Sequence, residues 1–171
     1  RKESSAASDV YKRQGQYLSC FLTGCDDSVE GIFDHLKKLA LISRGAGGIG
    51  GHYSNIRGKN SVIKGTNGLS NGLIPMFKIF NDTTKLINQG GKRQGSQAVY
   101  IETHHPDIMA VLDLRKNNGN EDDRARDLFT ALWVSDLFME KVLANEEWCL
   151  FSEDECPGLS NVYGEEYKKL Y

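Results

Sequence analysis

The chain has 171 residues, of which 39% are apolar and 26% are charged, and its formal net charge is −2. This length supports one modest domain with its own core rather than two. The charge argues against a nucleic-acid or anionic-membrane surface, and no apolar run approaches the roughly 20 residues that cross a bilayer. We therefore expect a cytoplasmic protein without nucleic-acid or membrane partners.

The first residues differ in character from the rest. Residues 1–14 have no apolar period and resemble a translated sequencing adaptor. We expect them to be a non-native or disordered tail, and residues 15–171 to form the domain. Because the sequence ends at Tyr171 inside a helical pattern, we also expect the domain to be cut there.

Strands and helices alternate in the predicted pattern. Apolar runs predict strands at 17–22, after the glycine-rich run 45–51, and at 98–101, 129–134 and 148–151. Helical spacing predicts helices at 29–44, 72–88, 107–116, 136–143 and 165–170. This alternation favours βα units and a parallel sheet or barrel.

Two predicted helices have recognisable starts, and a connection lies between them. Residues 26–28, Asp-Asp-Ser, offer capping oxygens to the first helix, and Asn71 is expected to cap the second. Residues 58–72 are expected to be a turn-rich connection.

Two glycine-rich loops, residues 45–51 and 89–95, could hold a polyphosphate through their backbone N–H groups. Neither matches a P-loop or Rossmann pattern, and such a loop taken alone is more often a plain turn. The anion interpretation is favoured by cationic side chains in or close to these loops, namely Arg57, Lys59, Lys64, Lys92 and Arg93.

The cysteines and histidines do not form a motif by themselves. The four cysteines stand at 20, 25, 149 and 156, in spacings that match no zinc pattern. A lone cysteine in a buried strand, as predicted for Cys20, is usually a small hydrophobe. His104 and His105 are adjacent at a strand end and should point in opposite directions, so no shared metal is predicted. Glu102 and Asp107 are interpreted as structural hydrogen-bond partners.

The order of the motifs along the chain resembles the large subunit of class I ribonucleotide reductases. The resemblance covers the chain after its N-terminal tail. The motifs are Ser19-Cys20-Phe21-Leu22, Asp27-Ser28, Ala46-Gly47-Gly48-Ile49-Gly50, Ile56-Arg57, Gly65-Thr66-Asn67-Gly68, Ser70-Asn71-Gly72-Leu73-Ile74-Pro75-Met76, Asn88-Gln89-Gly90-Gly91-Lys92-Arg93, Arg124-Ala125-Arg126-Asp127-Leu128-Phe129 and Glu155-Cys156-Pro157-Gly158-Leu159.

The resemblance implies an α/β fold, roughly the first third of a ten-stranded α/β barrel. It also implies a protein that reduces ribonucleoside diphosphates to deoxyribonucleotides by a thiyl-radical mechanism, under allosteric control by a dNTP or ATP. The implied partners are a ribonucleotide substrate, a second large subunit, a metal-containing small subunit that supplies the radical, and thioredoxin or glutaredoxin.

The same resemblance implies roles for individual residues. Cys20 would be one of two redox-active thiols, and Ser19, Gly48 and Arg93 would contact the substrate. The effector would be bound by Asp27, Ser28, Val29, Arg44, Arg57, Lys64 and Gly65. The loop that links effector and substrate would comprise Gln89, Gly90, Gly91, Lys92, Arg93, Gln94 and Gly95. We expect Arg57 and Arg44 near Asp27, Cys20 inside the barrel, and this loop between Cys20 and Asp27.

One family segment is missing from the sequence. The Asn-x-Cys-x-Glu pattern, where the family has its radical cysteine and its acid/base carboxylate, does not occur. We therefore expect the chain to be inactive on its own and to bind no metal or other cofactor. The alternative is a stand-alone nucleotide-binding or subunit-contact module without catalysis. Reading the source DNA past both ends would distinguish the two hypotheses.

Overall fold

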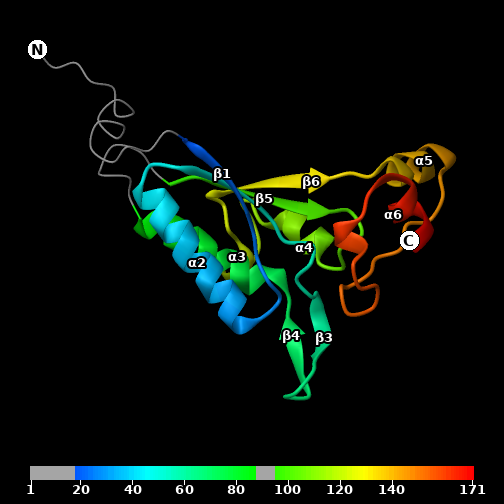
Figure 1. Ribbon diagram of the computed structural model, residues 1–171, viewed down its shortest axis with the longest axis horizontal. Helices are drawn as coiled ribbons and strands as arrows, with labels where there is room; N and C mark the ends of the chain where they lie inside the picture. The colour runs from blue at the N-terminus through cyan, green and yellow to red at the C-terminus, as the bar shows by residue number, and fades with distance from the viewer. Residues whose placement is uncertain (1–17, 88–94) are drawn as a thin grey trace, which may run out of the picture.

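The computed structural model describes residues 18–87 and 95–171, and its centre is a four-stranded sheet in the order β1-β2-β5-β6 (Figure 1). The strands are β1 (Cys20–Gly24), β2 (Gly48–His52), β5 (Gln97–Glu102) and β6 (Leu128–Trp133). All three pairings are parallel, and the register places Cys20 opposite Gly48 and Gln97 opposite Leu128. The predicted α/β class with a parallel sheet is confirmed.

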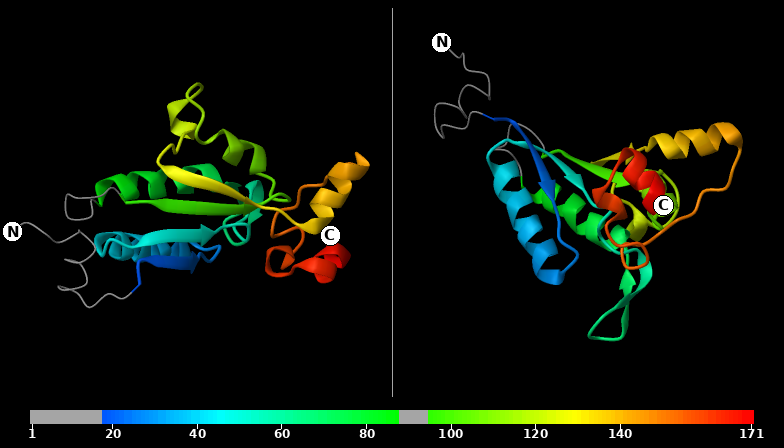
Figure 2. Two further views of the ribbon diagram at one scale, coloured as in Figure 1. Left: turned by 90° about the horizontal axis from the view of Figure 1, so that it is seen from above. Right: turned by 45° about the vertical axis from the view of Figure 1, so that its right-hand side comes forward.

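Three helices cover one face of this sheet (Figure 2). They are α2 (Val29–Arg44), α3 (Leu73–Leu86) and α4 (Ile108–Asp113). Their buried apolar side chains join those of the strands in one core, which includes Leu39, Leu73, Phe77, Phe80, Val111, Ile49, Val99, Ile101 and Leu128. Tyr53 lies fully buried in this core, where its hydroxyl accepts a hydrogen bond from Gln97 Nε2 at 2.8 Å.

The two long helices begin in different ways. The Ser28 hydroxyl accepts a hydrogen bond from the Gly31 N–H at 2.9 Å, so the predicted cap of α2 is confirmed. The predicted Asn71 cap of α3 is wrong, because Gly72 occupies that position and makes no side-chain cap. Instead, the distant Asp107 carboxylate accepts from the Leu73 N–H at 2.8 Å.

The connection predicted over 58–72 is a β-hairpin. Its strands, β3 (Lys59–Ile63) and β4 (Gly68–Asn71), pair antiparallel and extend away from the sheet and helices (Figure 1). The turn between them uses the left-handed backbone at Gly65 (φ 107°) and Asn67 (φ 51°). The many turn-forming residues concealed the strands in the sequence pattern.

The C-terminal part contains α5 (Asp136–Ala144), α6 (Gly164–Leu170) and the short 3-10 helix η2 (Leu159–Asn161). The strand predicted at 148–151 is wrong. The N–H of Cys149 donates to the Tyr171 hydroxyl, and the N–H of Phe151 donates to the carbonyl of His104. These groups thus bond to a side chain and a loop rather than to a neighbouring strand.

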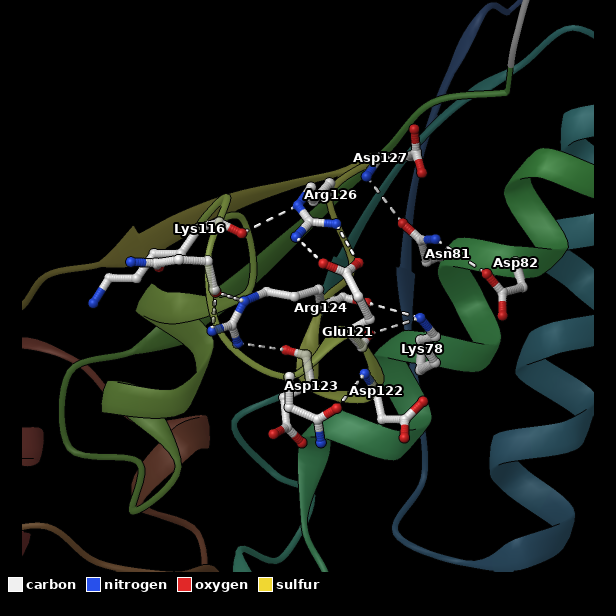
Figure 3. Close-up of polar contacts among 12 residues, drawn as sticks. Lys78, Asn81, Asp82, Lys116, Glu121, Asp122, Asp123, Arg124, Arg126 and Asp127 are labelled. Carbon is white, nitrogen blue, oxygen red and sulfur yellow. Dashed lines mark hydrogen bonds and ion pairs between the residues drawn. The ribbon is translucent and has the colours of Figure 1, made fainter.

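The connection from α4 to β6 is fixed to α3 by charged and polar groups (Figure 3). It contains the 3-10 helix η1 (Glu121–Asp123). Lys78 Nζ on α3 donates to the carbonyl oxygen of Glu121 at 3.0 Å, and Arg126 forms a two-pronged ion pair with the Glu121 carboxylate at 2.6 and 2.7 Å. Asn81 Oδ1 accepts from the Asp127 N–H at the start of β6. These contacts hold β6 in register with the core.

No helix within residues 18–87 and 95–171 is both long and apolar enough to span a membrane.

Candidate functional site

The sheet face opposite the helices carries the predicted redox thiol. Alternate residues of a strand point to opposite faces, so Cys20 and Leu22 share one face with their register partners Gly48 and Gly50. Cys20 is exposed, and Leu22 is 90% exposed. The predicted burial of the Cys20 strand is therefore wrong, because the described residues cover only the other face of β1 with helices.

Two predicted substrate contacts, Ser19 and Gly48, lie beside the predicted redox thiol Cys20 at the start of β1 and β2. The N–H of Gly48 donates to the carbonyl of Ser19 at 2.7 Å, and the Ser19 hydroxyl lies 3.8 Å from the Cys20 sulfur. A side-chain carbon at Gly48 would lie 3.9 Å from that sulfur. With glycine at this position, one flank of the thiol is open to a reactant.

A predicted effector pair forms at the opposite ends of the same strands. Arg57 Nε donates to Asp27 Oδ2 at 2.7 Å, and Arg57 Nη1 donates to the carbonyl of Val62 at 3.2 Å. These contacts use two of the five N–H donors of the guanidinium. Both side chains of the ion pair are about a quarter exposed, so the pair is accessible to a ligand.

The other effector candidates lie at different distances from this ion pair. Ser28 and Val29 follow Asp27 directly at the start of α2. Lys64 and Gly65 lie in the turn of the β3–β4 hairpin, whose foot carries Arg57. The structure therefore places Asp27, Ser28 and Arg57 together, with Lys64 at the far end of an exposed arm.

Arg44 does not lie near Asp27. It is the last residue of α2, a helix of 16 residues that begins directly after Ser28. At 1.5 Å per residue, the helix separates the two ends by about 24 Å. The expectation that Arg44 joins the Asp27 cluster is thus wrong within one chain, because Asp27 lies just before the first residue of α2 and Arg44 is its last residue.

The predicted effector–substrate loop is only partly described. Residues 89–94, including Arg93, lie outside the described residues, and Gly95 is its described end. A side-chain carbon at Gly95 would lie 2.6 Å from the Ser43 hydroxyl and 3.0 Å from the carbonyl of Thr84. The N–H of Ile49 donates to the carbonyl of Ser96. The loop thus ends beside the last turn of α2, at the end of the sheet where Cys20 lies.

A cavity of about 500 Å³ lies further along the open face. Its walls include Leu22, Gly50, His52, Tyr100, Trp133 and Tyr163. Motif reasoning missed it, although counting every second residue of the strands would have shown all of these positions except Tyr163 on one face.

The buried carboxylate of Glu102 lines this cavity between two histidines. It lies 3.2 Å from His52 Nε2 and 3.1 Å from His104 Nδ1. Burial acts to raise the pKa of Glu102, but the hydrogen bonds from His104 and His52 outweigh it and lower the pKa. The prediction that Glu102 is a hydrogen-bond partner is confirmed. No set of three metal-ligating side chains occurs in the described part of the chain.

Comparison with known proteins agrees with this arrangement. The family model of the ribonucleotide reductase barrel domain matches residues 18–171. Over 158 residues, 91% of this chain, the sequence is 60% identical to the ribonucleoside-diphosphate reductase large subunit of Plasmodium falciparum (isolate FCR-3 / Gambia) and 58% identical to that of Vaccinia virus (strain Copenhagen). It is 54% identical to the large subunit of Arabidopsis thaliana over the same length.

The chain spans 19–20% of the length of these relatives. The family match nevertheless covers the sheet, the helices, the hairpin and the C-terminal part described above. The resemblance drawn from the motifs is confirmed, and the chain belongs to the ribonucleotide reductase barrel-domain family.

Proposed function

We propose that this chain is the part of a ribonucleoside-diphosphate reductase large subunit that contributes one redox thiol and most of an effector site. The observation that carries the proposal is the position of Cys20 beside Gly48 and Ser19 on the open face of the sheet. An exposed thiol with an open flank suits a reductant that must reach a bound substrate.

The proposed chemistry is a two-electron reduction. Cys20 and a second cysteine of the complete subunit each lose one proton and one electron and join in a disulfide. The substrate exchanges its C2′–OH bond for a C2′–H bond, and the hydroxyl leaves as water. The radical that starts the reaction comes from the metal-containing small subunit. Thioredoxin or glutaredoxin then reduces the disulfide by thiol exchange.

The Asp27–Arg57 pair is the proposed effector site. The ligand would be a dNTP or ATP, with Asp27 accepting from a sugar hydroxyl and the guanidinium of Arg57 binding a phosphate. The support is a short ion pair whose arginine uses only two of its five N–H donors in its described contacts. Lys64 on the hairpin adds a second cation for the phosphates.

A second large subunit is the proposed partner at this site. Arg44 is about one helix length from Asp27, so it would serve an effector bound to the other copy. Two α2 helices that pack antiparallel would bring the end of one to the start of the other. Exposed apolar side chains on α2 support such packing, since Val29 is 69% and Phe33 58% exposed.

A chimeric enzyme tests the proposed function. Residues 18–171 would replace the matching segment of the Plasmodium falciparum large subunit, and CDP reduction would be assayed with its small subunit and a dithiol. We expect activity in the chimera, its loss in Cys20→Ser, and its retention in the matched control Cys149→Ser. A folded chimera that reduces CDP equally well with and without Cys20 would contradict the proposal.

The proposed compartment is the cytoplasm. All four cysteines are free thiols in the structure, as expected where glutathione and thioredoxin keep thiols reduced.

A further inference from the structure

The β3–β4 hairpin carries two residues that are proposed to bind the effector. Its direction is set at its two feet, where the chain enters β3 and where it leaves β4. Arg57 stands just before β3, and Lys64 stands in the turn. The hairpin extends away from the sheet and helices (Figure 1). A small rotation at the feet therefore moves Lys64 much more than Arg57. The groups that hold the feet thus determine how these two side chains are presented to an effector.

Both feet are held by one carboxylate. Asp107 Oδ1 accepts from the N–H of Lys59, the first residue of β3, at 3.0 Å. Asp107 Oδ2 accepts from the N–H of Leu73, which follows β4 after Gly72, at 2.8 Å. The Asp107 residue is only 9% exposed, so water competes little for these bonds. Asp107 thus joins the chain entering the hairpin to the chain leaving it.

The backbone of Asp107 is held by its neighbour His105. The N–H of Asp107 donates to His105 Nδ1 at 3.0 Å, so Nδ1 carries no proton. His105 Nε2 then carries the proton and donates to the carbonyl of Ile56 at 2.8 Å, one residue before Arg57. The turn after β5 therefore makes three backbone contacts with the hairpin base.

The sequence leaves room for this close approach. A side-chain carbon at Gly72 would lie 2.3 Å from Asp107 Oδ2, and the φ of Gly72 is 75°. A side-chain carbon at Gly58 would lie 2.3 Å from Pro106 Cγ. Both glycines stand where any larger residue would push the hairpin away from the 105–107 turn.

We propose that Asp107 is a positioning residue for effector binding: it locks the β3–β4 hairpin to the turn that follows β5 and so sets the geometry in which Arg57 and Lys64 meet an effector. The inference rests on the proposed function.

The first experiment tests the lock itself in the 171-residue chain. Amide hydrogen exchange would be measured at Lys59 and Leu73 in the wild type, in Asp107→Ala and in Asp107→Asn. The amide of asparagine has one acceptor oxygen, so it can hold only one foot. We expect about tenfold faster exchange at both amides in Asp107→Ala and at one of them in Asp107→Asn. The amide of Val99 in β5 is the internal reference. Unchanged exchange at Lys59 and Leu73 would overturn the inference.

The second experiment uses the chimeric subunit with dTTP as the effector probe. Asp107→Asn should raise the half-saturating dTTP concentration about tenfold. It should change the rate of ribonucleotide reduction at saturating dTTP by less than about twofold. Asp113→Asn, which removes the exposed ion pair with Lys116, is the matched control and should change neither quantity.

The outcomes separate the inference from the proposed function. If Arg57→Gln weakens the binding of dTTP but Asp107→Asn does not, the positioning role of Asp107 is wrong and the effector site stands. If Asp107→Asn lowers the maximal rate and leaves half-saturation unchanged, Asp107 is only a structural residue and the inference falls. If the wild-type chimera does not respond to dTTP, the effector site and the inference built on it both fall.

Discussion

The two faces of the parallel sheet differ in what their side chains do. On the covered face, Leu128 is fully buried with the side chains of α2, α3 and α4. On the open face, Leu22 is 90% exposed beside the Cys20 thiol. One alternating strand pattern thus divides the molecule into a side that stabilises it and a side that is available for chemistry. Stability and reactivity can therefore be changed separately, one face at a time.

The largest expected effect comes from matched leucine truncations on the two faces. Leu128→Ala removes a buried side chain and should lower the free energy of unfolding by about 2–5 kcal/mol. Leu22→Ala should lower it by less than about 0.5 kcal/mol, because that side chain is solvated already. Denaturant unfolding of the 171-residue chain measures both. Equal losses would show that the open face is covered in solution.

Thiol reactivity distinguishes the exposed face from the core. Cys25 is 4% exposed, and burial, with Asp26 and Asp27 nearby, raises its pKa to about 11. We expect iodoacetamide to modify Cys25 about 100-fold more slowly than Cys20 at pH 8, because so little Cys25 thiolate exists there. Peptide mapping in a Cys149→Ser background gives both rates. Comparable rates would contradict the burial of Cys25.

A smaller effect is expected from the hydroxyl at the centre of the core. Tyr53→Phe removes the acceptor of Gln97 Nε2 and the group 2.9 Å from His35 Nε2. The loss of these buried bonds should cost about 1–2 kcal/mol of unfolding free energy. Tyr163→Phe, at an 84% exposed residue, is the control and should leave the unfolding curve unchanged.

Mild acid should lower the stability of the fold through two buried histidines. Burial lowers the pKa of His35 and of His105, so both rings stay neutral in the folded state where free histidines take up a proton. The free energy of unfolding should therefore keep its full value above about pH 6.5 and should decrease as the pH drops below that value. His105→Gln should flatten this dependence in thermal unfolding scans. A wild-type midpoint that stays constant from neutral pH to about pH 5 would contradict the prediction.

Much of the fold could be read from local patterns. The predicted helix over 29–44 agrees with α2, and the helices predicted at 72–88 and 136–143 correspond to α3 and α5. Strong apolar periodicity and a serine cap need no tertiary information. The β3–β4 hairpin escaped prediction because its strands are polar and rich in turn formers, and the strand predicted at 148–151 failed because its N–H groups bond to Tyr171 and His104.

The site was predictable only as far as the motifs reach. The resemblance predicted Arg57 near Asp27, and their ion pair confirms this proximity. The direct contact between the two side chains was not predicted, because it depends on how two strand ends meet in space. The distance of Arg44 followed directly from the predicted helix, yet the family pattern suggested proximity. Asp107 was correctly interpreted as a hydrogen-bond partner, but the two N–H groups that donate to it lie 48 and 34 residues away along the chain. No local pattern encodes such contacts.

The strand order has a practical consequence for handling the protein. Within the described residues, β1 and β6 each pair with one strand only, so each leaves a row of unpaired N–H and C=O groups. Neither Cys20-Phe21-Leu22-Thr23-Gly24 nor Leu128-Phe129-Thr130-Ala131-Leu132-Trp133 contains a charged side chain to repel another strand. Strands of another molecule can therefore pair with β1 or β6 at the edges of the sheet. We expect self-association of the 171-residue chain that increases with concentration and temperature. Light scattering across a dilution series would measure it, and Leu22→Lys and Leu132→Lys are the substitutions that should suppress it.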